Sequence, residues 1–472
     1  MARPLVDTRS LVLFIACSLG ASMPEAQVAA DIIRVPGEVP TIQGAINAAE
    51  DGDVVLIAPG VYPERLNLSG KRITVIGEEY MRTTIVDAQG LGPALTCASG
   101  ETRETIIRDL QFINGVRSGS GGGAVIVNSS PTIEYCWFID HLADGGSGGA
   151  MQLRDSDAWI SKCVFQDNTA RGGDGGAIVV RGDGSPTIIN STFYDNRSES
   201  GAGGAIANRG QSKATIMNCL IEANQAQSGG GITNLGGSAP RIVNCTIVEN
   251  LGGGVVNRNR ATPMIANSII WGNEGGSILS LGSSRAEVGW SDVEGGHPGP
   301  GNIDADPLFD AGNRPTTDSP CLDAGHSGFV EQTFGFDKHF LPRLVDDPAP
   351  NTGGGAFPFV DMGAIERQDD RDIQLVAYGS CLDVLRLEVR NATPNGLVLI
   401  VTAPEGGAAR IADGHPCAGL VTGLASAGEV VVRAYADEFG SLDIETNGFC
   451  LEYGQALDVE SCTLSRVLTL SP

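Results

Sequence analysis

Short apolar strings recur along the chain at nearly constant spacing, each interrupted by asparagine and followed by a glycine pair or triplet. Typical examples are TIINSTFYDN, TIMNCLIEAN, RIVNCTIVEN and MIANSIIWGN. The Cys or Ser at the centre of each unit stands at positions 136, 163, 191, 219, 245, 268 and 291, so the period is 23 to 28 residues. Asp109 extends the series upstream. Such a period predicts a solenoid whose units contact mainly their neighbours.

Two kinds of solenoid have this period. A leucine-rich repeat needs several leucines per unit and usually a helical return, whereas these units have few leucines and a glycine-rich return. Short apolar strands separated by Asn and Gly bends instead describe a parallel β-helix with three strands per coil. The predicted fold class is therefore all-β. Glycine triplets such as Gly229–Gly231 are expected where the next strand begins, because the turn there needs positive φ or close backbone approach.

Two asparagine columns are predicted at the corners of the coils. Asparagine tolerates the left-handed conformation better than other non-glycine residues, and amides stacked about 4.8 Å apart can hydrogen-bond along a column. The first column comprises Asn190, Asn218, Asn244 and Asn267. The second comprises Asn168, Asn196, Asn224, Asn250 and Asn273, with His141 in the preceding coil. The expected inward stack is Phe138, Phe165, Phe193, Ile221, Ile247 and Ile270.

An open β-helix needs covered ends, because unpaired strands aggregate. In residues 41–79, Thr41 can cap a short helix that ends by Gly52, before the strands VVLIA and ITVIG. This segment resembles the opening of right-handed β-helix proteins of the pectate-lyase-like superfamily. The Asn-Cys-x-Phe-x-x-Asn units, with their Gly-Gly-Ala-Ile continuation, resemble the repeats of polymorphic outer-membrane proteins. The resemblance spans roughly residues 35–300 and implies a right-handed parallel β-helix, assigned with its cap to residues 31–300.

Residues 301–368 resemble the choice-of-anchor Q segments that often follow such helices in surface proteins. The matching strings are DADPLF, SPCLDAG, DKHFLPR and VDMGAIE, with Phe340 standing where that pattern usually has glycine. The resemblance implies display at or beyond the cell surface, with this segment as the C-terminal part of the β-helix.

From residue 370 to 472 the glycine triplets stop, and strands such as LRLEVR and EVVVRAYA predict a separate small β-sandwich. Four cysteines fall there, and we expect two disulfides without a fixed pairing, Cys450–Cys462 with Cys381–Cys417 being the preferred choice. The stacked pairs Cys136/Cys163 and Cys219/Cys245 either form disulfides or fill the core as small apolar groups, and we favour the core.

The net charge and the N-terminal residues indicate which partners and which cellular location to expect. The formal net charge of −25 makes nucleic acid and acidic membranes poor partners. Residues 1–30 predict a signal peptide with cleavage after Ala30, and its apolar run is too short to span a bilayer. We therefore expect a secreted or cell-surface protein without a transmembrane segment, acting as a monomer.

The superfamily resemblance implies polysaccharide lyases and hydrolases, which have characteristic catalytic residues. Lyases of this fold use an arginine or lysine base, commonly with Ca²⁺ held by aspartates. Hydrolases use Asn-Thr-Asp, Asp-Asp, Gly-His-Gly and Arg-Ile-Lys strings. Only Asp-Asp occurs, at Asp346-Asp347 and Asp369-Asp370, beyond the repeats.

Two charged columns remain as candidates. Asp140, Asp167 and Asp195 occupy one repeat position in successive coils and either hold Ca²⁺ or form a solvated acidic edge. Arg154, Arg181 and Arg209 occupy another, with Arg258 further along. These arginines either pair with uronate or sulfate groups or are neutralised by nearby Asp155, Asp157 and Asp183.

The sequence thus favours a structural, adhesive or glycan-binding β-helix protein. The alternative is a Ca²⁺-dependent lyase acting on acidic polysaccharide, with Arg154, Arg181 or Arg209 as base and Asp140, Asp167 and Asp195 holding the ion.

Overall fold

The structure is a computed structural model that describes residues 30–79, 83–330, 337–339, 343, 351–355 and 359–367, together with the backbone of ten strands between residues 374 and 469. The predicted signal peptide, apart from Ala30, lies outside the described residues. In the described residues, no helix is long and apolar enough to cross a membrane.

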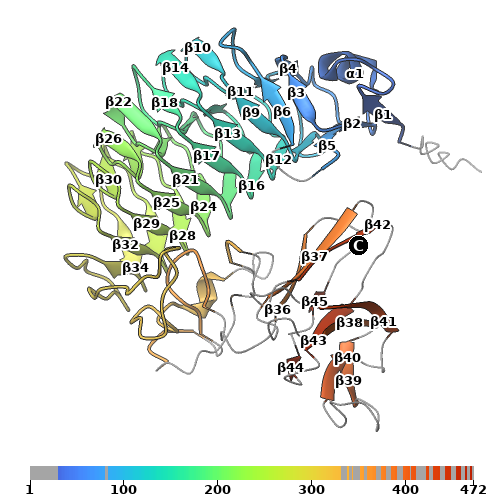
Figure 1. Ribbon diagram of the computed structural model, residues 1–472. Helices are drawn as coiled ribbons and strands as arrows, with labels where there is room; N and C mark the ends of the chain where they lie inside the picture. Colours follow the sequence, from blue (N-terminus) through green and yellow to red (C-terminus); the bar gives the residue numbers. More distant parts are fainter. Residues whose placement is uncertain are drawn as a thin grey trace, which may run out of the picture.

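Four parallel sheets make up the solenoid, and each coil adds one strand to sheets C, A and B in turn (Figure 1). Sheet A contains β1 (Ile32–Val35), β2 (Val54–Ile57), β5 (Thr74–Gly77), β8 (Ile106–Arg108), β12 (Thr132–Glu134), β16 (Trp159–Ser161), β20 (Thr187–Ile189), β24 (Thr215–Met217), β28 (Arg241–Val243), β31 (Met264–Ala266) and β34 (Glu287–Gly289). Sheet B contains β3 (Gly60–Tyr62), β6 (Thr84–Asp87), β9 (Gln111–Ile113), β13 (Trp137–Ile139), β17 (Val164–Gln166), β21 (Thr192–Tyr194), β25 (Leu220–Glu222), β29 (Thr246–Val248), β32 (Ile269–Trp271) and β35 (Asp292–Val293).

Sheet C and the short sheet D complete the coils. Sheet C contains β4 (Leu66–Asn67), β7 (Leu95–Cys97), β11 (Ala124–Val127), β15 (Met151–Arg154), β19 (Ile178–Arg181), β23 (Ile206–Asn208), β27 (Ile232–Leu235), β30 (Val255–Arg258) and β33 (Ile278–Ser280). Sheet D contains β10 (Val116–Gly119), β14 (Leu142–Gly145), β18 (Thr169–Ala170), β22 (Arg197–Ala202) and β26 (Gln225–Ser228). Sheet D belongs to excursions that leave the coil after sheet B and return through the glycine turns to sheet C. The predicted parallel β-helix is confirmed, with this fourth sheet as an addition.

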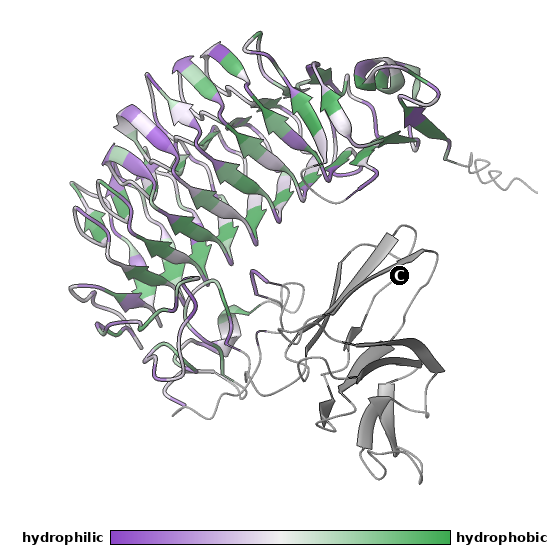
Figure 2. Cartoon of the chain, in the orientation of Figure 1, coloured by the Kyte–Doolittle hydropathy of each residue, from purple (hydrophilic) through white to green (hydrophobic). Residues whose placement is uncertain are grey.

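The inside of the solenoid is a continuous apolar stack, as predicted (Figure 2). Phe112, Phe138, Phe165 and Phe193 are in register on neighbouring strands of sheet B, with ring centroids 5.1, 5.2 and 4.7 Å apart. Isoleucines continue the column in later coils. Six buried cysteines are free thiols, so the core interpretation holds for the two stacked pairs; they are Cys97, Cys136, Cys163, Cys219, Cys245 and Cys321.

The corner between sheets A and B has the left-handed backbone predicted for the first asparagine column. Asn190, Asn218, Asn244 and Asn267 have φ values of 53°, 52°, 49° and 49°. The amides do not form one continuous ladder. Asn218 donates to Asn190 across 3.0 Å, whereas Asn267 pairs with the backbone of His326.

The corner between sheets B and D carries the second asparagine column, which forms an unbroken ladder. The Nδ2 of Asn196 donates to the Oδ1 of Asn224 over 2.9 Å, and the same oxygen accepts the backbone N–H of Asn196 at 3.0 Å. This pattern runs through Asn168, Asn196, Asn224, Asn250 and Asn273. At the N-terminal end, the backbone N–H of His141 donates to Asn168.

A third ladder lies on the inner side of sheet C, where sequence reasoning did not place one. Asn208, Asn234 and Asn257 are fully buried, and each of the first two amides donates to the next at 2.9 and 2.8 Å. Asn257 donates to Ser280, which ends the column.

Close packing between coils explains the glycine triplet. Gly229 has a φ of 64°, and a Cβ on Gly230 or Gly231 would lie 2.3 or 2.5 Å from a carbonyl oxygen of the next coil. Both predicted reasons therefore apply, positive φ at the first glycine and close approach at the others.

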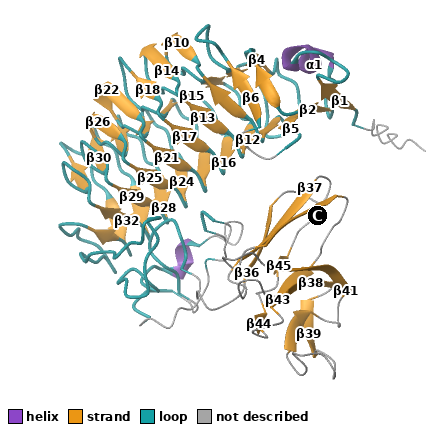
Figure 3. Cartoon of the chain, in the orientation of Figure 1, coloured by secondary structure: helices purple, strands orange, loops and turns teal. Residues whose placement is uncertain are grey.

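At the N-terminal end, α1 (Ile42–Ala48) packs against β1, β2 and β4 (Figure 3). Thr41 is its N-cap, and its Oγ1 accepts the N–H of Gly44 at 3.1 Å. Lys71 donates from Nζ to three carbonyl oxygens at the C-terminal end of the helix. The helix ends at Ala48, before Gly52, because Ala49 is already extended.

The described part of residues 301–367 adds no further complete coil to the solenoid. Ile303 bridges to Asp292, η1 (Ser327–Phe329) follows, and His326 bridges to Gly354. The segment packs along the A/B corner, where Ala364 donates its N–H to Thr246 and Arg343 contacts Asn218. Phe329 packs on an outward apolar row of sheet A formed by Ile189, Met217, Val243 and Ala266.

Beyond residue 370 the described strands pair antiparallel. The strands are β36 (Gln374–Tyr378), β37 (Val384–Arg390), β38 (Leu397–Ala403), β39 (Gly406–Arg410), β40 (Val421–Leu424), β41 (Glu429–Tyr435), β42 (Leu442–Asn447), β43 (Tyr453–Asp458), β44 (Thr463–Leu464) and β45 (Leu468–Thr469). The β-sandwich stays a prediction. The predicted disulfide cysteines, Cys381, Cys417, Cys450 and Cys462, lie outside the described residues.

Candidate functional site

The predicted arginine column exists and stands at the end of sheet C. Arg154 is in register with Arg181, and Arg209 follows the residue that pairs with Val180, so the three side chains belong to successive coils. In the next coil this position of the column is occupied by Leu235, which is in register with Arg258 one coil later. Neighbouring parallel strands are about 4.8 Å apart, so this column brings like charges close together.

Three of these arginines reach back to a glycine turn of the preceding coil. Arg181 donates from Nη2 to the Oγ of Ser147 at 2.6 Å, and Arg258 donates to Ser228 at 3.0 Å. Arg209 forms an ion pair with the Oδ2 of Asp174 at 2.6 Å.

These partners form a column of their own, the turn column. It is defined as the residue directly before the glycines that lead into five successive strands of sheet C: Ser120, Ser147, Asp174, Ala202 and Ser228. Its first members are linked, because the side chain of each one accepts the N–H of the next: Ser120 from Ser147, Ser147 from Asp174, and Asp174 from Ala202. Sequence reasoning missed this column. The signal was a small or acidic residue at one fixed place before each glycine pair.

The two columns match coil by coil. Arg181 reaches Ser147 and Arg209 reaches Asp174, whereas the coil that has Leu235 is preceded by the apolar Ala202. The turn column thus binds Arg181 and Arg209, which are neighbours in the arginine column and repel each other.

Charge in the column is only partly neutralised. Burial lowers the pKa of Arg181, and the neighbouring Arg209 and Arg154 lower it further, while Asp174 acts in the opposite direction. Arg154 is exposed, and none of the described residues forms an ion pair with its guanidinium. Three guanidinium groups therefore share one close carboxylate.

The acidic neighbours proposed from the sequence have other partners. Asp155 accepts the backbone N–H of Asp183, and Asp157 accepts that of Ser185. They support the turn between sheets C and A, and Asp174 is the carboxylate that pairs with the column.

The acidic column lies elsewhere, at the corner between sheets B and D. Asp140, Asp167 and Asp195 are exposed and have φ values of 57°, 54° and 56°. Ala223 and Glu249 hold the same conformation in later coils. Burial and the charge of Asp167 raise the pKa of Asp140. In the described residues no three His, Cys, Asp or Glu side chains converge on a metal-sized site.

One comparison with known proteins bears on the fold class. A family model described as a right handed beta helix region matches residues 122–291. The catalytic unit of a thermostable GH87 alpha-1,3-glucanase from Streptomyces thermodiastaticus strain HF3-3 has 16% sequence identity, covers 60% of this chain and 70% of that chain, and gives a TM-score of 0.21. No curated protein matches the chain. Residues 122–291 therefore match a right-handed β-helix region, and they lie within a longer parallel β-solenoid.

Proposed function

We propose that this protein is an exported β-helix protein that binds acidic polysaccharide along its arginine column and has no catalytic role. The observation that carries the proposal is the alignment of Arg154, Arg181 and Arg209 in successive coils with a single paired carboxylate, Asp174. On a chain of net charge −25, this is a local cationic strip on an otherwise acidic protein.

A polymer suits the column better than a single anion. The guanidinium groups repeat along the helix axis at about the strand spacing of 4.8 Å, so a chain with regularly spaced carboxylate or sulfate groups can contact several of them. Arginine binds such groups bidentately, and positions already held by Ser147 and Asp174 lower the entropy lost on binding.

The cellular location of the protein is also part of this proposal. The signal-like N-terminus of residues 1–30 supports export, and the choice-of-anchor Q resemblance of residues 301–368 supports display at the cell surface. The pectate-lyase-like resemblance supports a glycan as ligand. The protein acts as a monomer in this proposal.

A Ca²⁺-dependent lyase is the second candidate, favoured by one observation. A base must lose its proton, and the pKa of Arg181 is lowered by burial and by the neighbouring arginines. Asp140, Asp167 and Asp195 would have to hold the ion, but they end sheet B whereas Arg181 ends sheet C. The binding function therefore ranks first.

The experiment uses the chain from Asp31 onward on immobilised polygalacturonate, dextran sulfate and neutral dextran. We expect saturable retention on the two polyanions that weakens as salt rises, and little retention on dextran. The triple variant R154A/R181A/R209A should lose most of this retention. R314A is the matched control, because Arg314 pairs with Asp310 outside the column.

Unsaturated-uronate absorbance and new reducing ends, followed with Ca²⁺ and with chelator, separate binding from catalysis. Turnover that disappears with chelator and in R181A would replace the binding proposal by the lyase. Equal retention of the triple variant and R314A would reject the column as the binding surface.

A further inference from the structure

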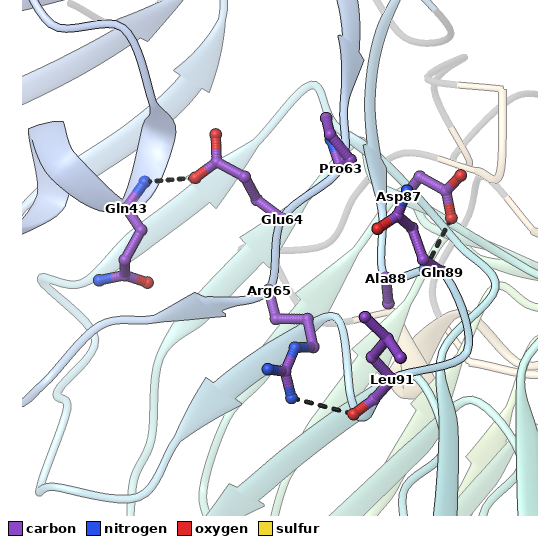
Figure 4. A pocket seen from close by; sticks show the side chains of 8 residues that line it. All are labelled: Gln43, Pro63, Glu64, Arg65, Asp87, Ala88, Gln89 and Leu91. Atoms are coloured by element: carbon purple, nitrogen blue, oxygen red, sulfur yellow. Dashed lines mark hydrogen bonds between the residues drawn. The ribbon is translucent and has the colours of Figure 1, made fainter.

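A polar pocket lies at the N-terminal end of the solenoid, separate from the arginine column. Gln43 of α1, the Pro63–Arg65 connection between β3 and β4, and residues 87–91 at the end of β6 line it (Figure 4). Its volume is about 260 Å³. This is just below the range of about 300–1,000 Å³ usual for drug-sized ligands, so the pocket has room for one ring-sized group.

Arg65 is exposed in this pocket and has no neutralising carboxylate. Its Nη1 donates to the carbonyl oxygen of Leu91 at 3.0 Å. A Cβ on Gly92 would lie 2.7 Å from the same nitrogen, so the glycine makes room for the guanidinium. In the described part of the chain no ion pair involves Arg65, and its other N–H groups remain available.

Another pocket at the same end of the molecule contains an arginine that is neutralised, and it serves as a comparison. That pocket, of about 340 Å³, contains Arg72, which pairs with Asp51 at 3.0 Å and Glu104 at 3.4 Å. The guanidinium of Arg72 in the larger pocket is therefore already neutralised by carboxylates, whereas that of Arg65 in the smaller pocket is not.

The two carboxylates of the pocket that contains Arg65 differ in how many hydrogen bonds their oxygens already accept. Glu64 is committed, since its two oxygens accept the backbone N–H groups of Ile42 and Gln43 at 2.9 and 2.8 Å. Asp87 uses Oδ1 to accept from Gln89 and Asn114, which leaves Oδ2 as an acceptor. Among its charged groups the lining thus offers one donor, Arg65, and one acceptor, Asp87, and the formal charge of Glu64, Arg65 and Asp87 is −1.

This set of groups selects the class of ligand. A net negative lining disfavours an anion, whereas a guanidinium with available N–H groups and a free carboxylate oxygen match the acceptor and donor roles of hydroxyl groups. Pro63 and Leu91 add apolar surface, and Leu91 is 69% exposed. An apolar face beside hydrogen-bonding edges is the chemistry of a pyranose ring.

We propose that this pocket binds one neutral pyranose residue, with hydroxyl groups between Arg65 and Asp87 and the ring face against Leu91. The site goes beyond the proposed binding of acidic polysaccharide, because it uses other residues and another ligand class. Its success or failure is therefore independent of the arginine column.

The test is saturation-transfer NMR and calorimetry on the chain from Asp31 onward, with the methyl glycosides of glucose, galactose and mannose, and with glucuronate. We expect at least one neutral glycoside to bind with a Kd on the order of 1 mM. R65A and D87N should each weaken it by about tenfold or more, since each removes a charge-assisted hydrogen bond.

Two further variants keep the result interpretable. L91S preserves the backbone carbonyl that holds Arg65 and should weaken binding by several-fold, and R72A should leave it unchanged. No binding of any neutral glycoside up to about 50 mM, far above the expected Kd, would reject the proposal. Binding of glucuronate alone would also reject it, because the pocket would then be an anion site. Binding that survives R65A would place the ligand elsewhere.

Discussion

Arg343 and Asn218 lie 125 residues apart in the sequence, and the Nε of Arg343 donates to the Oδ1 of Asn218 at 3.0 Å. Asn218 belongs to the column at the A/B corner, so this bond attaches the segment after the repeats to the side of the solenoid. Arg343 also donates to the carbonyl of Gly363 and pairs with Glu366, and both charged side chains are fully buried.

The first prediction concerns this buried pair. R343A leaves Glu366 buried without its cation, and we expect a loss of about 3–5 kcal/mol in the free energy of unfolding of the unit that contains the pair. Urea unfolding followed by circular dichroism measures it. R314A removes an exposed pair and should change stability by about 1 kcal/mol or less. An R343A protein as stable as R314A would show that the segment is not held by this pair.

The second prediction is a pH dependence of the same attachment. Burial raises the pKa of Asp361 to about 7, against the N–H groups of Arg367 and Asp323 and the charge of Arg343, which lower it. The pKa of Glu366 is also raised by burial and by Asp361. A raised folded-state pKa means that the folded protein binds the proton more tightly than the unfolded chain.

The contribution of Asp361 to the free energy of unfolding should therefore rise as the pH falls from about 7. It should level off below the pKa of an unfolded aspartate, about 3.9. Unfolding midpoints between pH 8 and pH 5, about this window, measure the effect. D361N carries no titrating carboxyl and should flatten the curve. A wild-type midpoint that falls steadily over this range, with D361N behaving alike, would contradict the assignment.

The third prediction concerns the asparagine ladder at the B/D corner. The Nδ2 of Asn224 donates to Phe193, Glu222 and Asn250, and its Oδ1 accepts from Asn196. N224A leaves several buried groups unpaired, at about 1–3 kcal/mol each, so we expect a loss of at least about 3 kcal/mol.

Asn47 provides the control for this ladder. It lies on α1 and accepts one exposed hydrogen bond from Gln43, so N47A should cost well under half as much. Thermal and urea unfolding compare the two variants. Equal losses would show that the ladder adds nothing beyond an ordinary surface amide.

Periodic features of the fold could be predicted from the sequence because one physical reason recurs in every coil. The left-handed corner at Asn190 and the ladder at Asn224 are examples. The inner ladder through Asn234 was missed, because its column begins only at Asn208, after Leu153 and Val180 occupy the same place. A partly polar column of this kind has no constant signature along the chain.

Contacts without periodicity could not be predicted. The hydrogen bond from Arg343 to Asn218 joins segments that are distant in the sequence, and no local sequence pattern predicts it. At the candidate site, the alignment of Arg181 with Arg154 followed from spacing alone. Its partner Ser147 did not, because serine beside glycine is ordinary turn composition and only the three-dimensional stacking of coils brings the two side chains together.

The last prediction separates the two interpretations of the acidic column. Asp195 has a φ of 56°, and Ala223 and Gly272 hold left-handed conformations at the same corner in other coils, so the backbone explains an aspartate there without a metal. D195G should leave stability nearly unchanged. D195V should lose about 1–2 kcal/mol, because a branched side chain disfavours this conformation.

Calcium provides the second half of this test, through thermal unfolding with and without about 1 mM Ca²⁺ or chelator. The triple variant D140N/D167N/D195N keeps residues that tolerate the corner and removes the charge whose repulsion contributes to the raised pKa of Asp140. If the column is a solvated edge, the wild type and the triple variant respond equally to Ca²⁺. A Ca²⁺-dependent rise in midpoint that only the wild type shows would instead make these carboxylates an ion site, and would strengthen the lyase candidate.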